Sequence, residues 1–127
     1  HIMKKQGELA ESKFIVECLS REFGVSVPFG DSSPYDLIVT GKEISRVQIK
    51  STTRLYRNRY HVTVGWGHKS KKVYDDKKID VFAVHILDHP WYIIPSGEIK
   101  TTTINLYPHR LNGVGKYEIY KGAWDLL

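Results

Sequence analysis

The sequence is poor in cysteine, with Cys18 as its only one among 127 residues. A lone cysteine excludes an internal disulfide, and no secretory signal opens the chain, so we expect a protein of the reducing cytoplasm. No apolar run approaches the ~18 residues that a membrane span requires, which argues against a membrane protein. Cys18 itself is expected to be a small buried residue on a helix.

Methionine is equally scarce. Because Met3 is the first and only one, His1 and Ile2 are interpreted as vector residues and set aside. A hydrophobic content of 41% is ample for one core, and 26% charged residues argue against wholesale disorder. No repeat, low-complexity tract or linker divides the chain. Residues 3–127 are therefore expected to form a single domain.

Acidic residues are nearly absent from the middle of the chain. Residues 46–78 hold ten bases and only two acids, Asp75 and Asp76, so this third carries +8. The whole chain carries +5, which leaves −3 for the remainder. A basic middle on a mildly acidic chain favours a polyanionic partner such as nucleic acid. The alternative is a solvated lysine-rich face.

The hydrophobic periodicity predicts an α/β (α+β) fold. A helix is expected over residues 6–23, with Gly24 ending it. Its expected apolar residues are Leu9, Val16, Leu19 and Phe23, supported by Ala10, Ile15 and Cys18. Strands are expected over residues 35–40, 44–51, 60–66, 79–87 and 91–94, a short extended piece over 25–29, a loop or exposed helix over 68–78, and a strand followed by a helix over 117–127. The predicted order is α-β-β-β-(α)-β-β in one mixed sheet.

Two of these strands, joined by a turn at residues 41–42, carry polar residues that a core hairpin does not need. Gln48 and Lys50 are two apart, so they share one strand face, while Val47 and Ile49 face the opposite apolar layer. Pairing of the strands brings Asp36 to the same end as Lys50. A carboxylate, an amide and an amine are thus expected to meet at one sheet edge.

This combination suits metal-assisted phosphodiester hydrolysis. Asp36 offers a charged oxygen, and Gln48 and the backbone carbonyl of Ile49 offer neutral ones, which are the ligands of a hard divalent cation. Lys50 can steady a hydroxide or a phosphate oxygen beside the metal. Glu8 and Glu11 of the helix are both candidates for a second carboxylate, and periodicity does not separate them. The alternative for Asp36 and Lys50 is a cross-strand ion pair, worth roughly 0–1 kcal/mol.

The string "PYD…VQIK" resembles the PD-(D/E)XK nuclease motif, with Tyr35 inserted between Pro34 and Asp36 and with Gln48 in the second acidic position. The stretch "QGELAE" resembles the family's N-terminal helix, whose glutamate falls on Glu11. The pattern "VPFGDSSPYDLIV…RVQIKS", followed by "IDVFAVH" and "WYIIP", is similar to a small subgroup. That subgroup includes a cyanobacterial group I intron homing endonuclease and relatives close to Holliday junction resolvases. The likeness covers residues 6–95.

The resemblance implies a restriction endonuclease-like core, a mixed sheet flanked by helices, and a magnesium-dependent DNA endonuclease, with Mn²⁺ as the other candidate ion. It implies metal ligation by Asp36 and Glu11, an active-site role for Gln48 and a catalytic role for Lys50. Gln48 departs from the Asp or Glu of most members, and a neutral amide binds a cation more weakly. Because the resembled subgroup carries Gln there, loss of activity is not implied.

The expected partner is double-stranded or branched DNA. The residues expected to hold its backbone are Arg54, Arg57, Arg59, Lys69, Lys71 and Lys72. One such fold has one site and a duplex has two strands, so a homodimer or a dimer of dimers is expected. Two alternatives remain: a structure-selective, Holliday junction resolvase-like nuclease, and a non-catalytic DNA-binding module degenerate at Gln48. The histidines (His61, His68, His85 and His89) lack compact zinc-ligand spacing.

Overall fold

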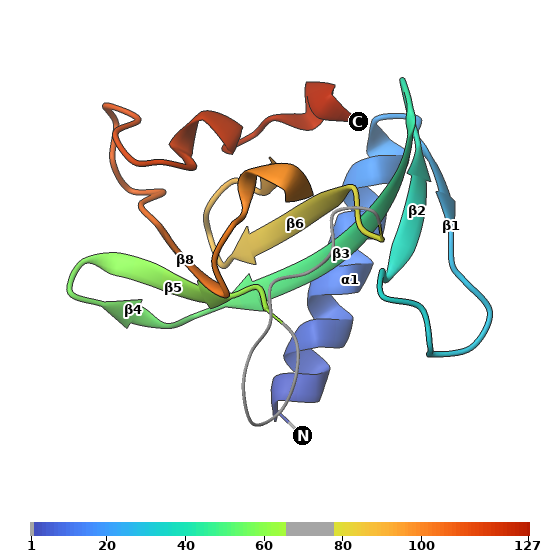
Figure 1. Ribbon diagram of the computed structural model, residues 1–127, viewed down its shortest axis with the longest axis horizontal. Coiled ribbons are helices and arrows are strands. Elements are labelled where there is room, and N and C mark those ends of the chain that lie inside the picture. Colours follow the sequence, from blue (N-terminus) through green and yellow to red (C-terminus); the bar gives the residue numbers. More distant parts are fainter. Residues whose placement is uncertain (1, 66–77) are drawn as a thin grey trace.

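The computed structural model describes residues 2–65 and 78–127, which form one long helix, two sheets and three short 3-10 turns (Figure 1). The helix is α1 (Ile2–Ser20). The larger sheet has the order β1-β2-β3-β6-β7, with β1 (Gly24–Ser26), β2 (Leu37–Thr40), β3 (Ile44–Thr52), β6 (Val81–Ile86) and β7 (Tyr92–Pro95). The smaller sheet has the order β4-β5-β8, with β4 (Leu55–Tyr56), β5 (Arg59–Thr63) and β8 (Thr103–Leu106). Within the described residues, no helix is long and apolar enough to cross a bilayer.

The predicted mixed sheet is confirmed, but its membership differs from the prediction. The central strands β3 and β6 run parallel, with Val47 opposite Val81, and the other pairs of the larger sheet are antiparallel. The strand predicted over residues 60–66 is β5, which belongs to the smaller sheet and not to the main one. Its partner β8 was missed, because a four-residue strand that begins at a run of threonines is equally typical of a turn.

The larger sheet is covered differently on its two faces. Helix α1 covers one face, where Phe14 and Cys18 pack against Val47 and Ala83, so Cys18 is buried as predicted. Strands β5 and β8 cover the other face and pack against Phe82 and neighbouring apolar residues. Among the described residues the prediction of flanking helices is therefore wrong on one face, where a small sheet takes the place of a helix. The predicted element between β5 and β6, over residues 68–78, lies almost wholly outside the described residues.

The buried face of α1 agrees with the prediction at Ala10 and Cys18 but not at the larger aliphatic residues. Leu9, Val16 and Leu19 are exposed by 55%, 65% and 58%. The buried residues are Ala10, Phe14 and Cys18, spaced by four. Both stripes have helical periodicity, but the second places one large ring between two small side chains, which lets the helix approach the sheet. The Phe14 ring then packs on the indoles of Trp91 and Trp124, at centroid distances of 5.2 and 5.6 Å.

Helix α1 also ends earlier than predicted, at Ser20 rather than at Gly24. Glu22 adopts a left-handed conformation with φ of 61°. Its amide donates to the carbonyl of Leu19 at 3.0 Å, and the amide of Phe23 donates to the carbonyl of Cys18 at 3.0 Å. These two bonds form a Schellman cap that usually has glycine in the left-handed position. Because glutamate and not glycine occupies this position, the end of the helix could not be predicted from the sequence.

The C-terminal segment forms two 3-10 turns, at Glu118–Tyr120 and Trp124–Leu126, instead of the predicted strand and helix. It is anchored to the body by Glu118, whose buried carboxylate accepts the Tyr92 hydroxyl at 2.5 Å and the Tyr107 amide at 3.0 Å. The buried Leu127 closes the chain against the turn between β2 and β3, where its carbonyl accepts the Glu43 amide. Figure 1 shows this end of the chain beside the C-terminal end of α1.

Candidate active site

Asp36, which immediately precedes β2, is attached to β3 through both its main chain and its side chain. Its amide donates to the carbonyl of Val47 at 2.8 Å. Its carboxylate oxygen Oδ2 accepts the amide of Ile49 at 2.7 Å. The N–H and C=O of one strand residue project to the same strand edge, so the Ile49 carbonyl lies on the Asp36 side of β3. The carboxylate is therefore held in a fixed position beside a backbone carbonyl.

A pocket of about 240 Å³ opens between this strand edge and the helix. Asp36 and Glu11 both line it, together with residues of the loop over 27–35. Glu8 is exposed and does not line the pocket. The structure thus separates the two glutamates that periodicity left equivalent, and it favours Glu11 as the partner of Asp36.

Gln48 and Lys50 lie opposite Phe82 and Val84 in the parallel pairing of β3 with β6. The sequence prediction for this strand is confirmed, because Val47 and Ile49 pack on the α1 side. Gln48 and Lys50 alternate with them and belong to the other face. Neither Gln48 nor Lys50 lines the pocket that Asp36 and Glu11 share. Lys50 is nevertheless close enough to Asp36 for its charge to act on that carboxylate.

The two pocket carboxylates are electrostatically unfavourable as they stand. Burial raises the pKa of Asp36, against the lowering effects of the Ile49 hydrogen bond and the Lys50 charge. Burial likewise raises the pKa of Glu11, and the negative charges of Asp36 and then Glu8 raise that pKa further. A cation placed between the carboxylates would relieve this repulsion.

A family model described as PD-(D/E)XK endonuclease matches residues 1–112. That range includes the four predicted site residues Glu11, Asp36, Gln48 and Lys50. The chain belongs to the PD-(D/E)XK endonuclease family. Family membership was predicted from "PYD…VQIK" and its flanking segments, and that prediction is confirmed. No curated protein matches the chain.

Two solved structures, of a homing endonuclease and of a Holliday junction resolvase, resemble the fold. The bacterial homing endonuclease I-Ssp6803I superposes with a TM-score of 0.83 at 22% identity, over 97% of this chain and 90% of that one. The Archaeoglobus fulgidus Holliday junction resolvase Hjc superposes with a TM-score of 0.57 at 11% identity, over 90% and 88% of the two chains. These likenesses confirm the predicted restriction endonuclease-like fold.

The donor set of the PD-(D/E)XK site fits a hard divalent cation. The carboxylates of Glu11, Asp31 and Asp36 line one pocket, the Ile49 carbonyl lies at the same strand edge, and the Gln48 amide is at the neighbouring strand position, so all of these donors are oxygen ligands. In residues 2–65 and 78–127, no three His, Cys, Asp or Glu side chains gather into a metal-binding group. With glutamine in the second acidic position, the negative charge that the motif brings to this pocket comes from Asp36 and Glu11, and Asp31 of the loop adds a further carboxylate to the lining.

The predicted DNA-binding residues fall partly within a hairpin. Strands β4 and β5 are joined by Arg57 and Asn58, which have φ of 50° and 65° and so make a type I′ turn. Arg57 is exposed, and its guanidinium lies 5.3 Å from the Tyr56 ring. Arg54 is exposed just before β4, and Arg59 is half-buried at the start of β5. The other predicted contacts (Lys69, Lys71 and Lys72) lie outside the described residues.

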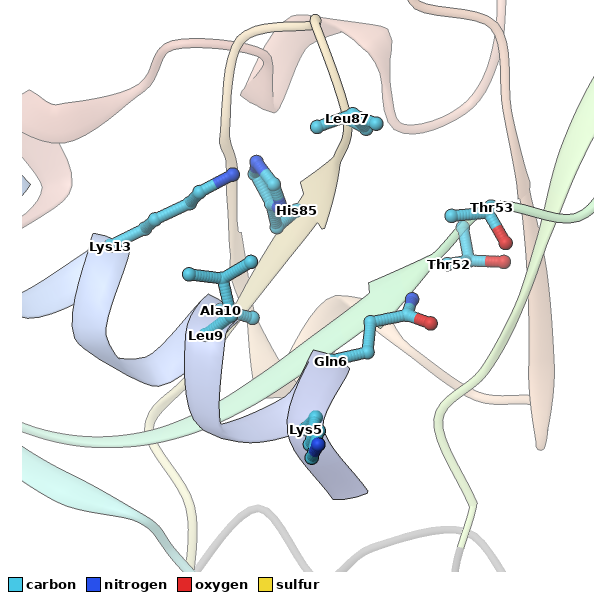
Figure 2. A pocket seen from close by; sticks show the side chains of 9 residues that line it. All are labelled: Lys5, Gln6, Leu9, Ala10, Lys13, Thr52, Thr53, His85 and Leu87. Carbon is cyan, nitrogen blue, oxygen red and sulfur yellow. The ribbon is translucent and has the colours of Figure 1, made fainter. Parts of the chain in front are cut away.

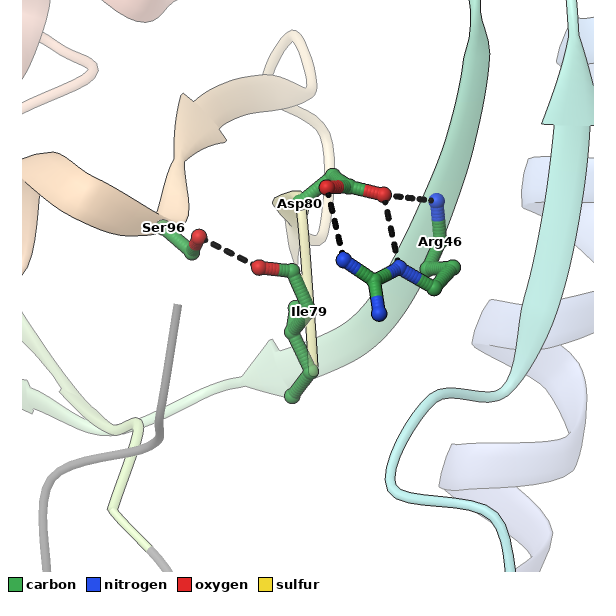
Figure 3. Close-up of polar contacts among 4 residues, drawn as sticks. All are labelled: Arg46, Ile79, Asp80 and Ser96. Atoms are coloured by element: carbon green, nitrogen blue, oxygen red, sulfur yellow. Dashed lines mark hydrogen bonds and ion pairs between the residues drawn. The ribbon is translucent and has the colours of Figure 1, made fainter. Parts of the chain in front are cut away.

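One base of the charged middle has a structural partner that the sequence did not reveal. Asp80 accepts the Arg46 backbone amide at 2.8 Å and its guanidinium at 2.9 and 3.1 Å (Figure 3). The Arg46 side chain holds the pKa of Asp80 below its usual range. Figure 3 also shows the Ser96 hydroxyl on the carbonyl of Ile79. The bonds between Arg46 and Asp80 fix the residue before β6 against β3, so the Arg46 side chain stabilises the sheet.

Proposed function

We propose that the chain is a magnesium-dependent endodeoxyribonuclease that hydrolyses phosphodiester bonds in duplex DNA. The observation that carries the proposal is the shared pocket of Asp36 and Glu11, beside the strand that bears Lys50, in a chain of the PD-(D/E)XK endonuclease family. Mn²⁺ is the alternative ion, since it accepts the same oxygen ligands.

Asp36 and Glu11 supply the charged ligands in this proposal, with the Ile49 carbonyl and the Gln48 amide as neutral ones. A bound cation would supply Lewis-acid chemistry, by polarising a phosphate oxygen and acidifying a water. The hydrogen bond from the Ile49 amide keeps Asp36 oriented, and it helps to keep that carboxylate ionised by opposing the effect of burial on its pKa. Gln48, which lacks a charge, orients a ligand or a water rather than balancing the cation.

Lys50 has a separate role in the proposed reaction. Its ammonium group carries the positive charge on the face of β3 opposite to Ile49. It holds the attacking hydroxide, which derives from water, or a phosphate oxygen. The hydroxide oxygen bonds to phosphorus as the P–O bond to the leaving oxygen breaks. Loss of Lys50 then removes stabilisation of the transition state while leaving the pocket carboxylates in place.

The proposed substrate follows from the basic middle of the chain. Arg54, Arg57 and Arg59 hold the DNA backbone, and Lys69, Lys71 and Lys72 add to that surface. Duplex DNA is preferred over a branched substrate because the fold superposes better on the homing endonuclease than on the resolvase, with TM-scores of 0.83 and 0.57. A junction-selective nuclease is the second candidate, and a non-catalytic DNA-binding module is the third.

Residues 3–127 form one domain with one site in this proposal. A duplex has two antiparallel strands, so cleavage of both requires two copies, in a homodimer or a dimer of dimers.

The test compares supercoiled plasmid, linear duplex and a four-way junction, each incubated with Mg²⁺ or with a chelator. Cleavage that requires both Mg²⁺ and Lys50 separates an enzyme from a binding module. Preference for the junction over the duplex would favour the resolvase-like alternative. Lys50→Ala with full activity would overturn the assigned mechanism.

A further inference from the structure

The loop between β1 and β2 carries a fully exposed aromatic ring at the rim of the candidate active site. Figure 1 shows this loop extending beyond the ends of both strands. Pro28 and Gly30 line the pocket that Asp36 shares with Glu11. Phe29, which lies between them, does not line it and is exposed by 103%. Single exposed apolar residues are common on protein surfaces, so the position of Phe29 at this rim, rather than its exposure alone, points to a function.

The backbone on either side of Phe29 keeps its ring at a corner of the chain. Pro28 is half-buried, and its own ring restricts its φ angle. Gly30 turns the chain with φ of 79°, in the left-handed region that favours glycine. Apart from its chain neighbours, no described atom lies within 4 Å of the place where a side chain on Gly30 would begin. The space beside the Phe29 ring is therefore open to another molecule.

The loop lacks the side chains with which proteins usually hold DNA phosphates. Residues 27–35 contain no lysine or arginine. Asp31 adds a carboxylate to those of Asp36 and Glu11 around the pocket, so the loop offers no electrostatic attraction for a phosphate. A contact between this loop and nucleic acid has to be largely apolar, and Phe29 is the exposed aromatic residue in position to make it.

We propose that Phe29 is a wedge that enters a base step of the DNA beside the phosphate held at the pocket. The proposal rests on the nuclease function proposed above, which brings a phosphodiester to this pocket. A duplex phosphate in that position brings the neighbouring bases against the loop, because successive base pairs lie about 3.4 Å apart along the helix axis. Apolar side chains inserted between bases partly unstack the step and kink the duplex.

Unstacking of the base step assists the reaction by moving the phosphate. Asp36 and Glu11 are half-buried, so a phosphate on the surface of a straight duplex has to move toward them. A kink supplies this displacement, and stacking of the Phe29 ring on a base offsets part of the cost of unstacking. Phe29 is therefore a positioning residue. It uses binding energy to deform the DNA, which raises the cleavage rate more than the affinity.

A partner protein is the alternative occupant for an exposed aromatic ring. Because Phe29 lies between two residues of the pocket lining, a protein that covered the ring would also obstruct the pocket that the proposed reaction needs open. A base step can cover the ring while the adjoining phosphate enters the pocket, so the position of Phe29 favours DNA. The two occupants differ in a measurable property, since only a wedge changes the stacking of the DNA.

The first test detects unstacking without requiring cleavage. Permanganate oxidises unstacked thymines, so it is applied to an end-labelled linear duplex bound in Mg²⁺, with every protein in the Lys50→Ala background. Reactive thymines are expected with this protein and with added Phe29→Trp, which keeps an aromatic ring, and they are expected to disappear with added Phe29→Ala. Leu87→Ala is the control, because Leu87 is 54% exposed but lines a pocket of about 300 Å³ on the opposite flank of α1 from Glu11 (Figure 2). Thymine reactivity that is absent, or equal with and without the Phe29 ring, would overturn the proposal.

The second test separates cleavage rate from affinity on supercoiled plasmid. Phe29→Ala is expected to lower the single-turnover rate at saturating protein roughly tenfold, while its affinity stays within about threefold of wild type. Phe29→Trp should retain most of the wild-type rate, and Leu87→Ala should match wild type in both measurements. An unchanged rate in Phe29→Ala would show that the ring does not position the phosphate.

The two tests distinguish failure of the wedge from failure of the nuclease. Wild type that binds DNA without cleaving it would refute the nuclease function, and the permanganate result would still decide whether Phe29 unstacks a base step. Cleavage by wild type with thymine reactivity that does not depend on Phe29 would refute the wedge alone. A protein that binds no DNA would refute both.

Discussion

At the scale of single residues, the site depends on how Asp36 and Glu11 are held. Asp36 takes two bonds from β3, and Glu11 reaches the same pocket from α1. The sequence predicts Asp36, Gln48 and Lys50 as site residues, because strand alternation and a short motif are local features. The family resemblance pointed to Glu11, but periodicity could not choose between Glu8 and Glu11, because that choice depends on how α1 is rotated against the sheet. The rotation is set by Phe14, whose packing is a tertiary property.

The raised pKa of Glu11 predicts a pH-dependent stability. Its ionised form is disfavoured in the folded protein, so the stability linked to this group is greatest below the ordinary Glu pKa of about 4.3 and is lost as pH rises through the higher folded pKa. Without metal, Glu11→Gln should therefore become more stable than wild type as pH rises above that range.

Thermal unfolding from pH 4 to 8 measures this difference, and Mg²⁺ should reverse it by stabilising wild type and not Glu11→Gln. Glu8→Gln is the control, because Glu8 is exposed and outside the pocket, and it should keep most of the Mg²⁺ response. Equal Mg²⁺ responses of Glu11→Gln and wild type would remove Glu11 from the ligand set.

Substitution of Gln48 by glutamate is expected to strengthen Mg²⁺ binding and to lower the cleavage rate. Gln48→Glu adds a third negative charge to the ligand set, so calorimetry should show tighter Mg²⁺ binding. Single-turnover cleavage should slow, because a more neutralised cation polarises phosphate and water less. Gln48→Ala should lose activity. If Gln48→Ala equals wild type in both measurements, this side chain has no part in the site.

At the scale of elements, α1 shows why a helix can be predicted while part of its buried face is mistaken. Two stripes with helical spacing compete, and the larger aliphatic one points outward. The end at Ser20 is hidden for a similar reason, since a left-handed Glu22 takes the place of the expected glycine. Strands β2, β3, β6 and β7 were found because their apolar runs are long or bounded by turns. The short strands β4 and β8 form only in pairing with β5, which local sequence does not record.

The assignment of faces predicts a clear difference between two substitutions in α1. Phe14→Ala leaves a cavity between Trp91 and Trp124 and should cost about 3–5 kcal/mol of the free energy of unfolding. Val16→Ala should change it by less than about 0.5 kcal/mol, because Val16 is mostly exposed. Urea denaturation at low protein concentration compares the two. Similar losses for both would contradict the observed packing.

The β4–β5 hairpin carries a prediction about salt dependence. Each phosphate contact contributes about 0.9 to the slope of log affinity against log salt concentration. Replacing Arg57 and Arg59 with Ala should flatten that slope by up to about two of these increments. Lys116→Ala is the control, because the Lys116 side chain is exposed in the C-terminal segment, and it should leave the slope unchanged. A fluorescence-anisotropy titration at several salt concentrations measures both. An unaltered slope in the double variant would place the DNA surface elsewhere.

At the scale of the whole molecule, a family fold, a carboxylate pocket and a basic middle occur together in one chain. The sheet brings Asp36 and β3 together, α1 brings Glu11 to them, and the hairpin of the small sheet carries the exposed arginines away from the core. Arg46 shows that the basic charge is not all available to a partner, since Asp80 engages it within the sheet. We propose that this assembly cleaves DNA with a divalent cation.

The most direct test is conversion of supercoiled plasmid to nicked and linear forms, followed over time with Mg²⁺ for wild type and Lys50→Ala. Wild type is expected to cleave only when Mg²⁺ is present. Lys50→Ala is expected to lose at least about 100-fold in rate, with DNA affinity changed by no more than a few fold. Wild-type protein that binds the plasmid in Mg²⁺ yet leaves it intact, or cleavage that persists in Lys50→Ala, would contradict the account.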